Sequence, residues 1–322
     1  MTSSISFYLI NRTVIRSLLL TLSLGATAPF MHSATAQRTA PPAELIQEFP
    51  VGNSPIGLAF DGANIWVANQ GDDTMSKLRA SDGALQGTFP VGDYPFKVVF
   101  DGANIWVTNQ GSGTVTKLQA SDGALEGTFP AGDYPSGIAF DGASIWVTNL
   151  FSGTVTKLQA SDGTPQGTFS AGVGIEPHDV ASDGLNIWVS NYVEHTVTKL
   201  RASDGVLQGT FRVGLGPEGL VFDGTNIWVA NYAGGTVTAL RASNGANQGT
   251  FQVGRGPFGL AFDGITIWAT NIGNDALTRL WSGLGTKRLR MEAHPTGIVY
   301  DGASMWVANN YSNVVSKISR KR

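Results

Sequence analysis

The sequence predicts an all-β protein built as a closed ring of seven four-stranded antiparallel blades. Three observations predict it. Glycine makes up 41 of the 322 residues and charged residues only 14%, which is too much glycine and too little charge for a helical protein. An Asp-Gly pair followed by a Trp-containing apolar segment recurs seven times. A proline stands 11 residues before each of these tryptophans.

The repeats keep a constant phase. Successive tryptophans are 40, 40, 42, 40, 40 and 38 residues apart. A repeat of this length with several short strands is typical of a β-propeller blade. The tryptophans are Trp66, Trp106, Trp146, Trp188, Trp228, Trp268 and Trp306, and the prolines are Pro55, Pro95, Pro135, Pro177, Pro217, Pro257 and Pro295.

The second repeat shows the four strands of one blade. Strands are expected at 96–100, 105–108, 114–118 and 125–129, separated by turns that contain Asp-Gly or clustered Asn, Gly and Ser. The seventh repeat ends after its third strand, 314–318, and lacks a fourth. The segment 44–51 resembles the missing strand. We therefore expect it to complete the last blade and close a single domain over 44–319, followed by a basic tail at 320–322.

Composition also excludes several classes. The net charge of −3 excludes a nucleic-acid binder that relies on positive charge, and 42% hydrophobic residues make disorder improbable. The absence of cysteine excludes thiol catalysis, cysteine-ligated metals, disulfides and a lipid anchor on cysteine.

The N-terminus is predicted to be a signal peptide over 1–36. Arg12 and Arg16 precede a short leucine-rich segment, and cleavage is expected after Ala36, followed by a short linker over 37–43. The mature chain would be a secreted or periplasmic monomer with no membrane span. An uncleaved membrane anchor is the alternative.

Residues that recur in every blade are interpreted as structural. The tryptophans are expected to wedge between neighbouring sheets, the Asn after each Trp strand to cap a turn, and the Asp-Gly pairs to form turns rather than calcium loops. Basic residues recur on the third strand, and a solvated strand face is favoured there over a belt for a polyanion. They are Lys77, Lys117, Lys157, Lys199, Arg279 and Lys317.

The segments 106–109 and 146–149, both Trp-Val-Thr-Asn, resemble the signature of YVTN-type propeller repeats. The wider pattern is similar to NHL-type propellers and to the streptogramin (virginiamycin B) lyase family. The resemblance spans about residues 44–319 and implies a seven-bladed propeller. It does not decide the function, because this fold hosts binding proteins and enzymes alike.

Function is expected where the copies differ, at the axial mouth of the ring. The residue after each proline should lie near it, and the seven are Ile56, Phe96, Ser136, His178, Glu218, Phe258 and Thr296. A ligand is predicted to lie against Phe96, Phe258, Tyr192 and Tyr232, with polarity from His178 and Glu218.

The fourth repeat departs most from the others. Two extra residues precede Pro177, and Asp179 replaces the Gly found in five other copies; Lys97 is the other departure at this position. Charges on an innermost strand need partners, so either a pocket or an ion pair is expected. The seventh repeat adds His294, predicted to join a His/carboxylate cluster with Glu218 across the mouth.

The lyase resemblance implies specific roles for Glu176-Pro177-His178. Glu176 and Glu218 would hold Mg²⁺ and His178 would be the catalytic base of an elimination that opens a cyclic depsipeptide ester. Two positions at which that family uses a histidine and an acid hold Ser136 and Asn191 here.

The leading hypothesis is a module that binds a small molecule or an extracytoplasmic protein through the mouth, with no cofactor. A lyase-like Mg²⁺ enzyme and a structural cell-surface protein are the alternatives.

Overall fold

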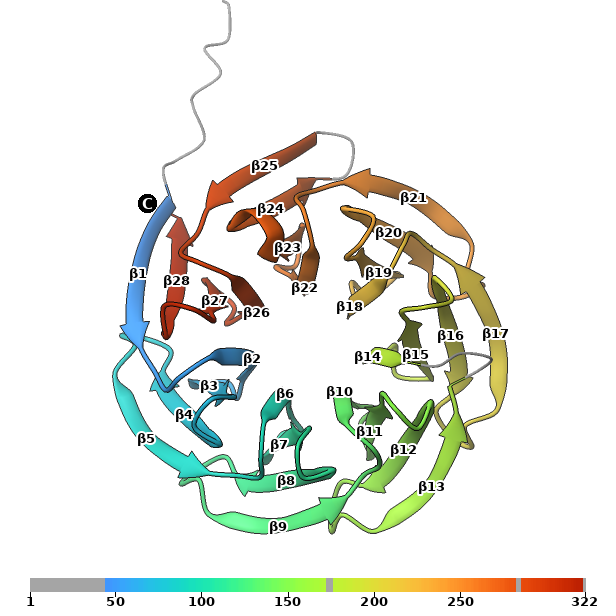
Figure 1. Cartoon of the computed structure of the whole chain (residues 1–322), viewed down its shortest axis with the longest axis horizontal. Helices are drawn as coiled ribbons and strands as arrows, with labels where there is room; N and C mark the ends of the chain where they lie inside the picture. The colour runs from blue at the N-terminus through green and yellow to red at the C-terminus, as the bar shows by residue number, and fades with distance from the viewer. Residues whose placement is uncertain (1–43, 172–175, 282–284, 321–322) are drawn as a thin grey trace, which may run out of the picture. The chain divides into compact units, whose positions relative to one another are not determined.

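The computed structural model describes residues 44–171, 176–281 and 285–320. They form seven four-stranded antiparallel sheets arranged as the blades of a ring (Figure 1). Blades 1 to 3 contain β2 (Pro55–Phe60), β3 (Asn64–Asn69), β4 (Thr74–Arg79), β5 (Leu85–Pro90); β6 (Pro95–Phe100), β7 (Asn104–Asn109), β8 (Thr114–Gln119), β9 (Leu125–Pro130); β10 (Pro135–Phe140), β11 (Ser144–Asn149), β12 (Thr154–Gln159) and β13 (Pro165–Ser170).

The other blades follow the same plan. Blades 4 to 6 contain β14 (Pro177–Ser182), β15 (Asn186–Asn191), β16 (Thr196–Arg201), β17 (Leu207–Arg212); β18 (Pro217–Phe222), β19 (Asn226–Asn231), β20 (Thr236–Arg241), β21 (Asn247–Gln252); β22 (Pro257–Phe262), β23 (Ile267–Asn271), the short 3₁₀ helix η1 (Ile272–Asn274), β24 (Ala276–Trp281) and β25 (Gly285–Arg290). Blade 7 contains β26 (Pro295–Tyr300), β27 (Met305–Asn309), β28 (Val314–Arg320) and β1 (Glu44–Pro50).

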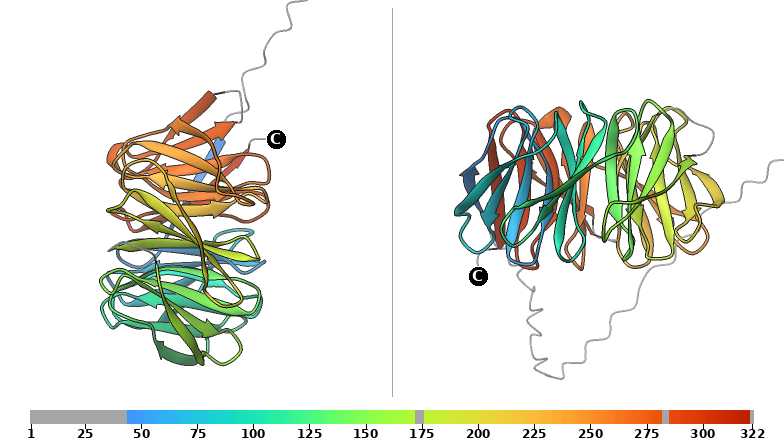
Figure 2. Two further views of the ribbon diagram at one scale, coloured as in Figure 1. Left: turned by 90° about the vertical axis from the view of Figure 1, so that its right-hand side faces the viewer. Right: turned by 90° about the horizontal axis from the view of Figure 1, so that it is seen from below.

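The predicted fold and ring closure are confirmed. β1 runs antiparallel to β28, with Glu44 opposite Arg320 and Pro50 opposite Val314. The first strands β2, β6, β10, β14, β18, β22 and β26 lie innermost, and each contacts the next around the ring. In side view the strands of each blade run between the two faces of the ring (Figure 2).

Each tryptophan is fixed by the Asp of its own Asp-Gly turn. The indole Nε1 of Trp106 donates a hydrogen bond of 2.7 Å to Asp101 Oδ2, and the same bond recurs in all seven blades. Trp106 is fully buried and packs against Phe129 of its own fourth strand, with ring centroids 5.5 Å apart. Trp106 also belongs to the same buried hydrophobic cluster as Ile145 and Val147 of the next blade. The predicted wedge role of the tryptophans and the turn role of the Asp-Gly pairs are therefore confirmed.

The lysines of the third strand correct the sequence analysis. Lys77, Lys117, Lys157 and Lys199 are each less than a tenth exposed, not solvated. The ammonium of Lys157 lies 5.0 Å from the centre of the Trp146 ring and donates to the carbonyl oxygen of Ala202 in the next blade. Equivalent bonds of 2.7 to 2.9 Å are made by the lysines of four other blades. We call these five residues the bridging lysines: Lys77, Lys117, Lys157, Lys199 and Lys317.

Four of the bridging lysines are buried and Lys317 is half-buried, because the next blade covers the third strand. The carbonyl groups of its turn supply partners for each ammonium, which offsets the cost of burying the charge. Two blades differ. Blade 5 has Ala239 at this position, and Arg279 of blade 6 bonds to Thr266 and Asp263 of its own blade.

Glycine on the innermost strand allows neighbouring blades to approach closely. A Cβ atom on Gly57 would lie 2.1 Å from the carbonyl oxygen of Phe96 in the next blade. The same close approach is seen at Gly219 and Gly297. Lys97 and Asp179 therefore occupy positions that are otherwise reserved for the smallest residue.

The predicted signal peptide, its cleavage site and the linker lie outside the described residues. Arg320, which was assigned to the tail, is the last residue of β28. Among the described residues, none belongs to a helix long and apolar enough to cross a membrane.

Candidate ligand-binding site

The candidate site lies where the first strands begin around the ring axis. The proline that starts each first strand pairs with the asparagine that ends the second strand, for example Pro177 with Asn191. We call the face that holds these ends the mouth face. The antiparallel register shifts just after each proline, between Pro177 and Val180 in blade 4. Such a bulge redirects side chains, and here it falls on His178 and Asp179.

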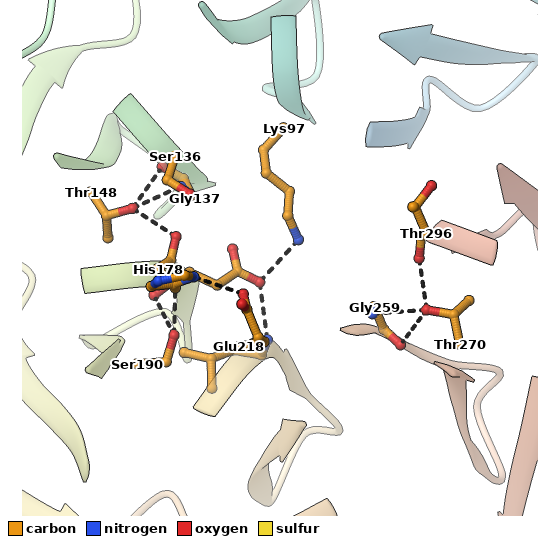
Figure 3. A network of polar contacts seen from close by, with 12 residues as sticks. Lys97, Ser136, Gly137, Thr148, His178, Ser190, Glu218, Gly259, Thr270 and Thr296 are labelled. Carbon is orange, nitrogen blue, oxygen red and sulfur yellow. Dashed lines mark hydrogen bonds and ion pairs between the residues drawn. The ribbon is translucent and has the colours of Figure 1, made fainter. Parts of the chain in front are cut away.

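His178 and Glu218 form a pair between adjacent blades. His178 Nδ1 lies 2.9 Å from Glu218 Oε2, and the two side chains are 20% and 13% exposed (Figure 3). The main chain of His178 is held from the preceding blade, because Thr148 Oγ1 donates to its carbonyl oxygen at 3.0 Å. The pair is thus positioned by three consecutive blades.

Aromatic rings extend from this pair across the mouth face. The ring of Tyr192 stacks on His178 with centroids 4.7 Å apart, and Tyr232 lies 6.5 Å from Tyr192. Burial raises the pKa of the Tyr192 phenol, and the negative charges of Glu218 and Glu176 raise it further. Glu176 is close because the backbone N–H of Tyr192 donates to its carbonyl oxygen at 3.1 Å.

Lys97 and Asp179 form a second pair beside the first. Lys97 Nζ lies 3.2 Å from Asp179 Oδ2, although the two residues belong to blades 2 and 4 (Figure 3). Asp179 Oδ2 also accepts the backbone N–H of Leu220, at 3.0 Å. The side chain of Asp179 lies over blade 3, since a Cβ on Gly137 would be 2.8 Å from Asp179 Oδ1.

The side chain of Lys97 also reaches toward blade 6. Its ammonium lies 5.6 Å from the centre of the Phe258 ring, and Phe96 meets the same ring edge-to-face at 6.3 Å. Charges on the innermost strands were expected to be paired or to line a pocket, and the structure pairs them. Lys97 thus contacts both Asp179 of blade 4 and Phe258 of blade 6.

His294 is not joined to the His178 pair by any described contact. Its ring stacks on Tyr311 with centroids 4.2 Å apart, and its backbone N–H donates to Asp275 Oδ1. Burial lowers the pKa of the imidazole, and the charge of Asp275 opposes this only in part. The predicted cluster of His294 with Glu218 is therefore not formed by the described residues.

The Mg²⁺ site implied by the lyase resemblance does not fit this chain. No group of three His, Asp or Glu side chains close enough to hold a metal occurs within the described ranges. Glu218 is engaged by His178. Asn191 binds Thr196 and Thr198 through Nδ2, as the equivalent Asn does in other blades, so it acts as a turn residue.

Comparison with known proteins supports the fold. No family profile matches the chain, and no curated protein sequence matches it. A solved streptogramin B lyase superposes with a TM-score of 0.76 at 20% identity, covering 86% of this chain and 98% of the other. Virginiamycin B lyase from Staphylococcus aureus gives 0.75 at 19% identity, covering 87% of this chain and 100% of the other.

A different protein is almost as similar. Hydrazine synthase from Kuenenia stuttgartiensis gives a TM-score of 0.73 at 18% identity, covering 90% of this chain and 98% of the matched chain. The chain thus shares the seven-bladed propeller fold with lyases and with hydrazine synthase. At these identities the likeness concerns the fold alone.

Sequence reasoning missed the residues that orient the site. Thr148 holds His178, and Ser190 Oγ accepts the backbone N–H of Asp179 at 2.9 Å. The signal was present, because the residue before the repeated Asn is Thr or Ser in some blades and Ala in others. A further set of variable residues, one in each blade, directly follows that Asn. Each donates its backbone N–H to the carbonyl oxygen of the residue before the proline. Only Tyr192 and Tyr232 of this set were predicted to contact a ligand. The seven residues are Gln70, Gln110, Leu150, Tyr192, Tyr232, Ile272 and Asn310.

Proposed function

We propose that this chain is a ligand-binding propeller whose site is the His178–Glu218 pair and the adjoining tyrosines. One observation carries the proposal. Residues that depart from the repeat average, scattered from position 97 to 218, meet at one place on the mouth face. Structural repetition does not require such convergence, because the other blades close without these side chains.

The chemistry of the site indicates the kind of ligand contact. Glu218 and His178 offer a carboxylate and an imidazole that are partly desolvated, which strengthens polar recognition. Tyr192 and Tyr232 add ring surface next to this pair. A ligand with an apolar group and a hydrogen-bond donor fits these residues.

The test is selective retention of a ligand. Immobilised protein is incubated with a metabolite extract, and retained compounds are identified by mass spectrometry. A compound retained by the wild type should be lost from His178→Ala/Glu218→Ala. Arg201→Ala, on the opposite face, is the matched control. Equal retention by the double variant and the wild type would show that the mouth pair is not the site.

A secreted or periplasmic location is part of the same proposal, and it rests on the predicted signal peptide. N-terminal sequencing of exported protein should show cleavage after Ala36. A mature chain that still carries residues 1–36 would instead favour the anchored alternative.

A second candidate function is elimination on a cyclic ester. The observation that favours it is His178 Nδ1 held by Glu218, an arrangement that orients an imidazole for general-base catalysis. His178 would accept the proton α to the carbonyl as the ester C–O bond breaks. The step is proposed without a metal, because the described residues form no group that could hold one. Quinupristin, present with a virginiamycin B lyase in one solved structure, is a suitable probe. Ring opening by elimination changes its chromatographic retention without adding a water; unchanged quinupristin after long incubation would exclude the activity.

A further inference from the structure

The mouth face carries a hollow at the junction of blades 5 and 6. It is a groove of about 640 Å³, bounded by Tyr232 and the turn that follows it, the connection from β21 to β22, and Arg288 of β25. Its polar lining includes Gln252, Arg255 and Asn274, and the remaining lining is mostly glycine. No acidic side chain is among the described residues that line it.

The groove is positively charged, although the chain as a whole is negatively charged. The whole chain has a net charge of −3, yet both ionisable side chains other than Tyr232 in this lining are arginines. Arg255 and Arg288 are both exposed. Neither makes an ion pair with a carboxylate of the described part of the chain. Two guanidinium groups on one groove without a counter-charge favour an anion there.

The equivalent groove at the next junction has the opposite character. It is lined by Glu48, Asp275 and Glu292, with Arg290 as its single cation. The register shows that Arg288 and Glu48 are equivalent, since they lie opposite Thr278 and Ser316 of the third strands. Blade 5 has Thr250 at this position, opposite Thr238. Blade architecture therefore does not require an arginine at 288.

Arg288 is also held in place. Its guanidinium donates to the carbonyl oxygen of Val253, which lies in the same groove. A guanidinium has five N–H donors, so this bond orients the group and leaves donors for a ligand. Tyr232, which is 36% exposed, presents ring surface beside them.

We propose that this groove binds a small anion that carries a flat apolar group. Arg255 and Arg288 hold the anionic oxygens, and the Tyr232 ring packs against the flat group. The site adjoins the mouth pair and shares Tyr232 with the ligand site proposed for His178 and Glu218. Its charged residues are different, so variants of the charged residues test the two sites separately.

The experiment measures binding of phenyl phosphate by titration calorimetry at low ionic strength. Inorganic phosphate and phenol are titrated separately, because each carries one of the two groups of phenyl phosphate. Phenyl phosphate should bind more tightly than phosphate, phenol should not bind, and added salt should weaken the affinity. Arg255→Gln and Arg288→Thr, which restores the residue of blade 5, should each weaken binding roughly tenfold. Tyr232→Leu should remove the advantage of phenyl phosphate over phosphate.

Two controls separate this site from others. Arg201→Gln removes an arginine on the opposite face, and Glu218→Gln alters the mouth pair; neither should change the affinity. Absence of saturable binding to the wild type would overturn the proposal. So would equal affinity of the wild type, Arg255→Gln and Arg288→Thr.

Discussion

Lys157 donates a hydrogen bond from its ammonium to the carbonyl oxygen of Ala202, 2.8 Å away in the next blade. Its stem covers Trp146, and the ammonium lies 5.0 Å from the centre of that ring. One side chain thus joins the core of its own blade to the main chain of its neighbour.

We predict that Lys157→Met destabilises the ring. Methionine keeps most of the apolar stem but leaves the Ala202 carbonyl oxygen without its charged donor, which should lower the free energy of unfolding by about 2 kcal/mol. Urea denaturation followed by tryptophan fluorescence measures the change. Arg79→Met is the control, because Arg79 pairs with Asp82 on the surface and contributes little. Equal stability of the two variants would contradict the bridging role.

The pair of Lys97 and Asp179 should behave as a coupled unit. Lys97→Met leaves a carboxylate that is only 10% exposed without its cation, so each single variant should lose about 2 kcal/mol of stability. Combining Lys97→Met with Asp179→Asn should cost less than the sum of the two. A double-mutant cycle in urea measures this coupling, and strictly additive losses would show that the 3.2 Å contact has no energetic weight.

The Asp-Gly turns should make stability depend on acid pH. Burial alone would raise the pKa of Asp101, but hydrogen bonds from Trp106, Ala103 and Asn104 outweigh it and hold the pKa below its usual value. A carboxyl with a lowered folded-state pKa stabilises the protein above its unfolded pKa. That stabilisation is lost as the pH falls below roughly 4 and through the folded-state value.

Asp101→Asn should therefore be less stable than the wild type at pH 7 and approach it near pH 3. Thermal unfolding across this range gives the comparison. Asp133→Asn, on an exposed turn, should track the wild type throughout. Parallel curves for Asp101→Asn and the wild type would contradict the assignment.

Glu176 should be replaceable by glycine with a gain in stability. Its φ of 76° is left-handed, and the equivalent residues of the next two blades are Gly216 and Gly256, with φ of 62° and 61°. Relief of this conformation in Glu176→Gly should add about 1 kcal/mol. Gly216→Glu is the reverse experiment and should lose a similar amount. A destabilised Glu176→Gly would mean that the glutamate side chain supports the fold.

The blade, the ring and its closure followed from the sequence because they repeat. Seven copies of Trp and Pro in phase determine the strand order, and the unpaired segment at 44–51 could complete only the blade that lacked a strand. The bridging lysines were misinterpreted for a physical reason. The partner of Lys157 is a main-chain carbonyl group, which leaves no trace in the sequence, so its burial could not be predicted from charge patterning.

The candidate site was predicted only in part. His178 and Glu218 follow equivalent prolines in adjacent blades, so their proximity could be expected. The pairing of Lys97 with Asp179 could not, because it depends on how far two side chains reach past blade 3. The predicted contact of His294 with Glu218 is not among the described contacts. The position of His294 just before Pro295 places it near the mouth but does not determine the direction of its ring, which stacks on Tyr311.

The joining of β1 to β28 has a consequence for how the protein forms. The first strand of the chain has no neighbour to pair with until the last one has been made, so nascent or truncated chains expose two unpaired strand edges at once. The ring therefore closes only after β28 has been synthesised and can pair with β1. In a circularly permuted chain that places β1 directly after β28, the two strands would pair as a local hairpin. Closure of the ring would then not require contact between the two ends of the polypeptide, and folding should be faster.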